Sequence, residues 1–436
     1  MTTDIRDALV APYRNQFSPD GSAWLRALRQ QALDLFTGYG FPTTKNEDWH
    51  YTSPAPIVEA TFSPMKGALG TLTHDDVAPY TVGHFEWPTL VFVNGRYSPA
   101  LSRVDSLPKG VSVMSLASAL HEEPTLIERH LGKLARFDTQ AFAFTAINTA
   151  LLKDGAFLHV AQDTAVDTPI HLLYISDAGA EGGVSYPRNL FVVERNAKAS
   201  VIEQYASIGD ARYFTNAVSE AVIEDGATLH HYRLQREGKR AFHTGHVETS
   251  LGRDAHYVSF SFATGALLSR INIYATLAGE GCGATLNGLY MLDGEQVCDH
   301  QTRIEHAEPN TYSRETYKGI LDDASHGVFN GKVYVQPIAQ KTDGKQTNNT
   351  LLLSDRARID TKPQLEIFAD DVKCTHGATV GRLDEMAGFY MKSRGVGAET
   401  TRRLLTYAFA ADVLERIELE PLKESLERLT LQRYAG

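Results

Sequence analysis

A short turn pattern that recurs through the middle of the chain limits its possible folds more than any other feature. A Gly, Asp or Asn turn is followed by alanine and then by an apolar run at Asp154-Gly155-Ala156, Asn196-Ala197, Asp225-Gly226-Ala227, Asp254-Ala255, Cys282-Gly283-Ala284 and Asp323-Ala324. Successive alanines of this pattern lie 28 to 41 residues apart. A β-sandwich shows turns about every 8 to 12 residues without this longer period, whereas stacked coils require a small residue at each tight corner. The recurrence therefore favours a β-helix.

The composition supplies the interior that such a fold needs. Hydrophobic residues make up 43% of the 436 residues and charged residues 22%, which excludes a disordered chain. Beyond Leu152, short runs rich in Val, Ile, Tyr, Phe and Thr alternate with turn residues, and no helical period survives for about 230 residues. A single coil cannot bury its apolar face alone, so the coils must stack into one continuous core. We therefore predict a mainly β protein with a β-helix core over residues 151–381.

The amino-terminal region, residues 1–150, is predicted to be mixed and mainly helical. A helical face runs through SAWLRALRQQALDLF, with Ser22 as its N-cap and Gly38 as its end. Asn94-Gly95, between two apolar runs, predicts a tight hairpin. Two further helical stretches follow, MSLASALHEEPTLIERHLGKL and TQAFAFTAINTALL.

The carboxy-terminal region, residues 382–436, is predicted to be helical as well. DEMAGFYMKSR should end near Gly395, a second helix should follow from Glu399, and a third should start at Pro421. Two roles remain open for the apolar faces of these helices. They either cap the open end of the β-helix or form a docking surface for a partner protein.

The charge and the cysteines exclude several classes of function. A formal net charge of -11 and a pI near 5.8 argue against a nucleic-acid-binding protein. No stretch approaches the roughly 18 apolar residues of a membrane span, and the first residues lack the apolar segment of a signal peptide, so we expect a cytoplasmic protein. Three widely spaced cysteines form no disulfide framework; Cys282 and Cys298 are expected to be inert buried thiols.

One stretch, LEIFADDVKCTHGATVG at residues 365–381, places two metal-binding side chains together. Residues i and i+2 of a strand share a face, so Cys374 and His376 should project the same way, about 7 Å apart. Thiolate and imidazole suit iron-sulfur chemistry. Two ligands fill only half of a tetrahedral site, so a second chain would have to supply the others.

The other candidate groups are less convincing. His230-His231, His243-x-x-His246 and Cys298-Asp299-His300 lie among predicted strands without a carboxylate at a spacing that completes a metal site, and are expected to be structural. Asp322-Asp323 and Asp370-Asp371 suggest, as an alternative, a β-helix enzyme that acts on polysaccharide with paired acids, although adjacent strand residues face apart. No phosphate-binding loop and no nucleophile elbow occurs, so the chain should not hydrolyse ATP.

Several long blocks of the sequence resemble the SufB/SufD family of iron-sulfur cluster assembly proteins. They are AQKTDGKQTNNTLLLSDRARIDTKPQLEIFADDVKCTHGATVG at residues 339–381, VFNGKVYV before it, and FYMKSRGV and TYAFAADVLERI after it. PTTKNEDWHYT and VFVNGRYSPALS extend the similarity to the amino-terminal third. SufB-like chains have H-E-A after the motif histidine, whereas Gly377 supplies no carboxylate here. This difference places the chain on the SufD side of the family.

The resemblance implies a right-handed parallel β-helix with helical flanks and a scaffold without catalytic activity of its own. Its implied partners are SufB and the ATPase SufC, with a possible homodimer when the chain is isolated. His376 would be the transient metal ligand at the SufB interface, with Cys374 in a supporting role. No tightly bound cofactor is implied, only a transient iron-sulfur cluster. SufC would dock on the carboxy-terminal helices, where we expect Leu404, Leu405 and Phe409 to contribute because they lie on an apolar helical face beside basic residues.

Overall fold

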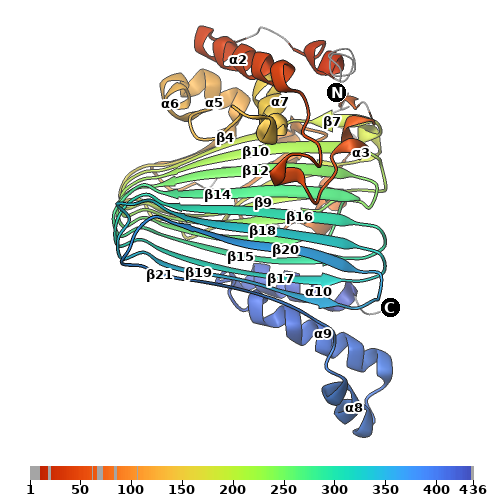
Figure 1. Ribbon diagram of the computed structural model, residues 1–436. Coiled ribbons are helices and arrows are strands. Elements are labelled where there is room, and N and C mark those ends of the chain that lie inside the picture. Colours follow the sequence, from red (N-terminus) through yellow and green to blue (C-terminus); the bar gives the residue numbers. More distant parts are fainter. Residues whose placement is uncertain are drawn as a thin grey trace.

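Two long β-sheets that face each other form the centre of the molecule (Figure 1). The computed structural model describes residues 10–17, 21–60, 62–65, 72–82, 86–105 and 107–433. Within this part of the chain eleven strands form sheet A and ten form sheet B. From β8 to β21 successive strands alternate between the sheets and pair in parallel, so each coil gives one strand to each sheet. The predicted parallel β-helix is confirmed.

The strands of sheet A are β1 (Ser63–Pro64), β4 (Val111–Ser115), β5 (Ala156–Val160), β7 (Gly183–Ser185), β8 (Arg188–Val193), β10 (Phe214–Ile223), β12 (Phe242–Leu251), β14 (Leu268–Leu277), β16 (Val297–His306), β18 (His326–Val335) and β20 (Arg358–Ile367). The strands of sheet B are β2 (Thr89–Val93), β3 (Arg96–Tyr97), β6 (Ile170–Ser176), β9 (Lys198–Ser207), β11 (Thr228–Arg236), β13 (His256–Ala263), β15 (Gly283–Leu292), β17 (Tyr312–Leu321), β19 (Asp343–Leu352) and β21 (Lys373–Gly381).

The corners between strands have the backbone that the turn pattern predicted. Asn196, Gly226 and Asp254 have φ of 58°, 69° and 52°, the left-handed region that Asn, Asp and Gly tolerate best. Each is followed by an alanine that is at most 1% exposed, because the chain bends tightly there. The two longest gaps in the alanine series each contain a corner with threonine in that place, after Asp163 (φ 58°) and after Asn310 (φ 59°). The true coil is therefore shorter than those gaps suggested.

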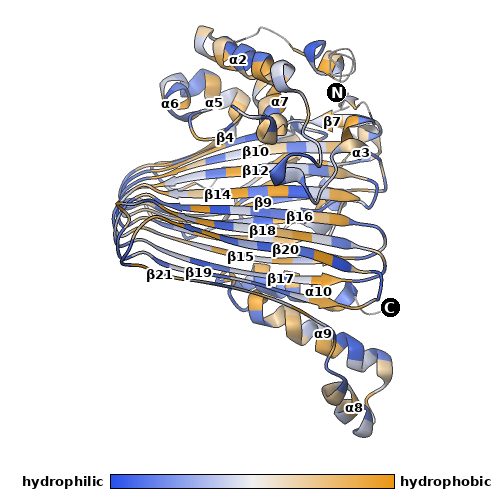
Figure 2. Ribbon diagram, in the orientation of Figure 1, coloured by the Kyte–Doolittle hydropathy of each residue, from blue (hydrophilic) through white to orange (hydrophobic). Residues whose placement is uncertain are grey.

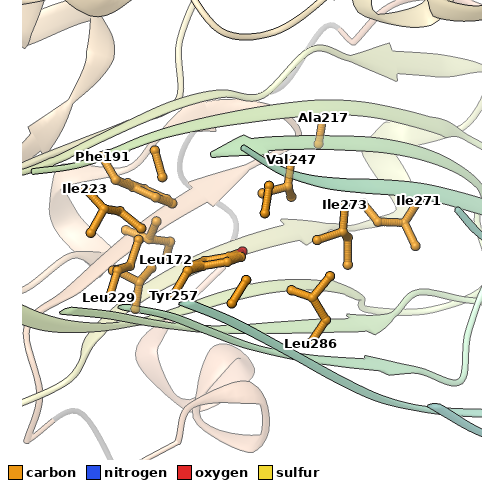
Figure 3. Packing of buried hydrophobic residues seen from close by; sticks show 14 of the residues in the cluster. Leu172, Phe191, Ala217, Ile223, Leu229, Val247, Tyr257, Ile271, Ile273 and Leu286 are labelled. Atoms are coloured by element: carbon orange, nitrogen blue, oxygen red, sulfur yellow. The ribbon is translucent and has the colours of Figure 1, made fainter. Parts of the chain in front are cut away.

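Apolar side chains from both sheets fill the space inside the coils. Figure 3 shows Phe191 and Ile273 of sheet A directed toward Leu172 and Tyr257 of sheet B. These four side chains are at most 1% exposed. Their inward positions follow the two-residue period of a strand, and their burial on stacking supplies the main stabilisation of the core.

Helices of the amino-terminal region cover one end of the solenoid and part of the outer face of sheet A (Figure 1). They are α2 (Ala23–Tyr39), α3 (Ala55–Val58), α4 (His74–Val77), α5 (Leu116–Glu122), α6 (Pro124–His130) and α7 (Ala143–Leu151), with the short 3-10 turns η1 (Glu47–Trp49), η2 (Ala78–Tyr80), η3 (Pro99–Leu101), η4 (Gln140–Phe142) and η5 (Ala178–Ala180). Phe36 of α2 and Ile147 of α7 share an apolar cluster with Phe214 and Phe242 of sheet A.

Two details of the amino-terminal region differ from the sequence prediction, and one agrees with it. Helix α2 runs past Gly38 and ends at Gly40, which has φ of 68° and donates its N–H to Phe36. Ser22 precedes α2 in an extended conformation, but its side chain makes no capping bond. The hairpin at Asn94-Gly95 is confirmed, with β2 and β3 antiparallel around it.

The division of the chain near residue 150 stays a prediction. Strand β2 pairs with β6 in sheet B, and β4 pairs with β5 in sheet A. Residues before that division therefore extend both sheets.

The carboxy-terminal helices lie on the outer face of sheet B and do not cap the solenoid. They are α8 (Glu385–Ser393), α9 (Ala398–Leu414) and α10 (Glu420–Arg433). Val413 of α9 and Leu422 of α10 pack in one cluster with Phe260 and Ile320 of sheet B. Of the two roles left open, the capping of the open end does not fit, because the buried apolar residues of α9 and α10 pack against the side of the stack. Among the described residues no helix is long and apolar enough to cross a membrane.

Candidate functional site

Cys374 and His376 lie on β21, the last strand of sheet B, at the end of the solenoid away from the amino-terminal helices (Figure 1). Cys374 is in register with Gly344 of β19, and His376 is in register with Gln346. Gln346 is 1% exposed and lies inside the coil below, so both residues of β21 stand over the interior. The predicted shared face is confirmed.

The two side chains have different surroundings. Cys374 is half-buried against the terminal apolar cluster that contains Val333 and Ala369. Burial raises the pKa of its thiol above the usual value, so the protonated form is favoured. His376 is exposed, and its ring has no hydrogen-bond partner in the described structure. His376 is thus the more accessible ligand, and Cys374 is the less accessible one.

The site lies at an end of both sheets that no further strand of the described residues covers. β20 ends sheet A and β21 ends sheet B, and every residue of β21 except Cys374 is exposed. Such edges leave one row of backbone N–H and C=O groups without strand partners, which favours pairing with another chain. Apolar side chains border this end, with Phe368 57% and Val380 51% exposed. The ligand pair therefore lies on a surface suited to protein association.

These side chains supply too few ligands for a complete metal centre. No group of three His, Cys, Asp or Glu residues that could hold a metal ion occurs in the described ranges. Cys374 and His376 together provide two donors, whereas a tetrahedral iron or zinc site needs four. The arrangement fits a site that two chains share.

The predicted docking residues on α9 differ in accessibility. Leu404 is 40% exposed, whereas Leu405 and Phe409 are half-buried. Phe409 packs against the sheet B cluster, and Lys318 of β17 lies 4.5 Å from its ring centroid and donates to its carbonyl oxygen. The role of all three residues in docking stays a prediction, and Phe409 also helps to hold α9 on sheet B.

A larger apolar surface lies on α8, which the sequence prediction did not select. Met386, Phe389 and Tyr390 are 76%, 70% and 59% exposed. Helix α8 extends away from the sheets, and Figure 2 shows hydrophobic residues along α8 and α9. The sequence contained a signal for this surface in FYM at residues 389–391, because three large apolar residues in succession on a helix cannot all face a core.

The histidines of the three groups weighed in the sequence, His230, His231, His243, His246 and His300, are all buried, and their structural role stays a prediction. His231 lies between Glu203 (3.1 Å) and the hydroxyl of Tyr257 (3.0 Å), and all three side chains are buried inside the solenoid. Burial alone would raise the pKa of Glu203, but the hydrogen bond from His231 and the charge of Arg233 outweigh it and lower the pKa to about 2. These groups hold one another in the core and do not reach solvent.

The aspartate pairs belong to turns and not to an acid-base site. Asp323 is a left-handed corner residue whose carboxylate accepts from the backbone N–H of Gly294. Asp322 pairs instead with Arg402 of α9 at 2.6 Å. Asp370 and Asp371 follow β20 in the next corner, where the N–H of Asp371 donates to Gln340. This geometry does not support the polysaccharide-acting alternative, which requires two carboxylates that face one sugar.

Comparisons with known proteins assign almost the whole chain. The family described as "SUF system FeS cluster assembly, SufBD core domain" matches residues 174–409, and "SufBD protein N-terminal region" matches residues 8–172. The iron-sulfur cluster assembly protein SufD of Escherichia coli (strain K12) is 35% identical over 93% of this chain and 92% of its own length. An iron-sulfur cluster assembly SufBD family protein of Synechocystis is 32% identical over 92% of this chain and 89% of its length. SufD of Bacillus subtilis (strain 168) is 28% identical over 98% of both.

Proposed function

Because the chain belongs to the SufBD family of the SUF iron-sulfur cluster assembly system, we propose that it is a non-catalytic scaffold subunit that works between two partners. A SufB-type chain would bind the open solenoid end, and the ATPase SufC would bind the carboxy-terminal helices. The observation that carries this proposal is the uncovered end, where both sheets stop and where His376 and Cys374 stand.

At this interface the chain would contribute ligands to a cluster that is cargo and not a resident cofactor. The accessible His376 ring would bind iron first, and the half-buried Cys374 would support it. The SufB-type partner would supply the remaining ligands, since two donors leave the coordination sphere half filled. The residues of this chain hold and orient the ligands, and ATP hydrolysis belongs to the other partner.

Docking of the ATPase would use the exposed apolar residues of α8 together with Leu404 of α9. An amphipathic helix that presents apolar side chains at successive turns is a common ligand for a hydrophobic groove. The contacts between Phe409 and Lys318 fix α9 on sheet B and so hold this surface in place. Movement of the ATPase would thereby reach the solenoid through α9.

When SufB is absent, the same open end would pair with a second copy of this chain. Both edge strands are long, β21 is almost wholly exposed and β20 is mostly half-buried, and an unpaired strand edge favours pairing with another strand. The homodimer and the complex with SufB would then exclude each other.

Three variants separate the two docking surfaces. Val380→Asp and Phe368→Asp place charge at the solenoid end, while Leu404→Asp places it on α9. In co-purification with both partners from the native host, the first pair should lose SufB and keep SufC, and Leu404→Asp should do the reverse. Retention of SufB by the end variants, with unchanged melting temperature, would contradict the proposal.

A further inference from the structure

A column of three residues runs along the solenoid axis and ends at His376. Glu315 of β17, Gln346 of β19 and His376 of β21 occupy in-register positions in three successive coils. Neighbouring strands lie about 4.8 Å apart, so these side chains stack on one face. Glu315 and Gln346 are 2% and 1% exposed, whereas His376 is exposed. The accessible imidazole therefore stands directly over a buried amide and a buried carboxyl group.

One hydrogen bond fixes the orientation of the buried amide. Gln346 Nε2 donates to Glu315 Oε2 at 2.6 Å, so the amide nitrogen points toward the preceding coil, which contains β17. A β-carbon at Gly331 of β18 would lie 2.0 Å from Gln346 Nε2, so the amide reaches across the interior to sheet A at this glycine, and a side chain there would displace it. The bond to Glu315 and the close approach to Gly331 together fix the position of the Gln346 amide.

The amide oxygen is left without a partner. Gln346 Oε1 is buried and accepts no hydrogen bond from any described residue. A buried acceptor without a donor costs about 1 to 3 kcal/mol, and few native side chains leave one unsatisfied. A donor that reaches this oxygen from the open end would remove that cost.

The ring of His376 can provide this donor. A neutral imidazole carries one N–H donor and one acceptor nitrogen, and the tautomer depends on what the donor binds. Histidines that bind metal almost always donate their other ring N–H to an oxygen acceptor. The nearest in-register side chain offers such an oxygen, whereas Cys374 stands over Gly344, which has no side chain.

We propose that Gln346, oriented by Glu315, is a positioning residue for His376. Its amide oxygen accepts one ring N–H and leaves the other ring nitrogen free to bind iron. This inference rests on the proposed role of His376 at the interface. It explains why the exposed His376 ring would keep one fixed orientation, with its unprotonated nitrogen directed toward the partner chain.

The chain contains a matched control for this column. Asn348, two residues along β19, is also 1% exposed and also faces inward. Its amide bonds to Tyr290 and Thr361, and it is in register with Ala378, which has no polar side chain. Asn348→Leu thus removes a buried amide at a similar depth without touching the column.

The test is the tautomer of His376 in the full chain labelled with 15N-histidine, its ring signals being assigned by comparison with His376→Ala. Wild type, Glu315→Gln and Asn348→Leu should show one tautomer, since each keeps the acceptor and its support. Gln346→Leu should show a mixture. The assembled complex with Gln346→Leu should bind iron at least tenfold more weakly than that with Asn348→Leu.

An unchanged His376 tautomer in Gln346→Leu would overturn the inference. If Gln346→Leu does not fold, Glu315→Leu can be compared with Glu315→Gln, because only Glu315→Leu removes the acceptor that orients the Gln346 amide. Equal tautomer ratios of His376 in these two variants would also overturn the inference. The two proposals can also fail separately. If the His376→Ala complex loads clusters normally while Gln346→Leu changes the tautomer of His376, the proposed function of His376 is wrong but its hydrogen bond to Gln346 Oε1 is supported.

Discussion

Glu47 and Lys362, 315 residues apart in the sequence, form an ion pair whose Oε1 and Nζ atoms lie 2.9 Å apart. Glu47 belongs to η1 in the amino-terminal region, and Lys362 belongs to β20, the last strand of sheet A. The amino-terminal segment therefore reaches along the solenoid to its open end. A partner that binds this end would meet residues from both ends of the sequence, and Glu47 would border that surface.

Replacement of His376 should separate cluster assembly from folding. His376 is exposed, so His376→Ala should keep the fold and partner binding, with at most the small fall in melting temperature that loss of the proposed bond to Gln346 would cause. Cluster accumulation on the anaerobically reconstituted complex should fall at least tenfold, as visible absorbance and iron content would show. Cys374→Ala should have a smaller effect on loading. A lower melting temperature of His376→Ala with normal cluster content would point to a purely structural histidine.

Substitutions on α8 and α9 should weaken ATPase binding for different reasons. Phe389 is 70% exposed, so Phe389→Asp should cost more than ~2 kcal/mol of binding, about thirtyfold in affinity, without a change in stability. Leu405→Asp and Phe409→Asp should weaken binding and also lower the melting temperature, because both side chains are half-buried and Phe409 packs on sheet B. Titration calorimetry and melting curves test both parts. Equal affinity of Phe389→Asp and wild type would exclude α8 from the interface.

Glu315 should make the stability of the chain depend on pH. Burial raises the pKa of Glu315 to about 7, against about 4.3 in an unfolded chain. Between these values the folded state binds more protons, so stability falls as pH rises, by on the order of 3 kcal/mol once pH exceeds 7. Glu315→Gln, which stays neutral, should be more stable than wild type at pH 8.5 and similar at pH 4.3. Urea unfolding at both pH values measures this, and an equal difference at both would refute the assignment.

A corner residue should show the cost of left-handed backbone. Asp254 has φ of 52°, which alanine adopts at a cost of roughly 1 to 2 kcal/mol. Asp254→Ala should lower the free energy of unfolding by about that amount. Asp254→Gly should cost less, because glycine has no β-carbon to clash. Equal losses in urea unfolding would show that the carboxylate, and not the backbone, matters at this corner.

Local backbone chemistry explains why the sequence alone predicts the coils. A left-handed corner favours Asn, Asp or Gly, and the tight bend favours a small residue directly after it. Each corner therefore appears in the sequence as a short motif of adjacent residues. The two-residue period of a strand likewise places Cys374 and His376 on one face without knowledge of the fold. Helices α9 and α10 begin at Ala398 and Glu420, each one residue before the predicted Glu399 and Pro421.

Only the tertiary structure decides how the coils stack and what covers them. In-register partners are 26 residues apart at Phe242 and Leu268 but 32 apart at His326 and Arg358, so coil length varies and register cannot be read from spacing. The position of Gln346 under His376 depends on that register, as does the packing of α9 on sheet B. An amphipathic helix specifies that one face is buried, but not whether it lies on the side of a stack or on its end. In this chain it lies on the side, and the end with His376 is left open.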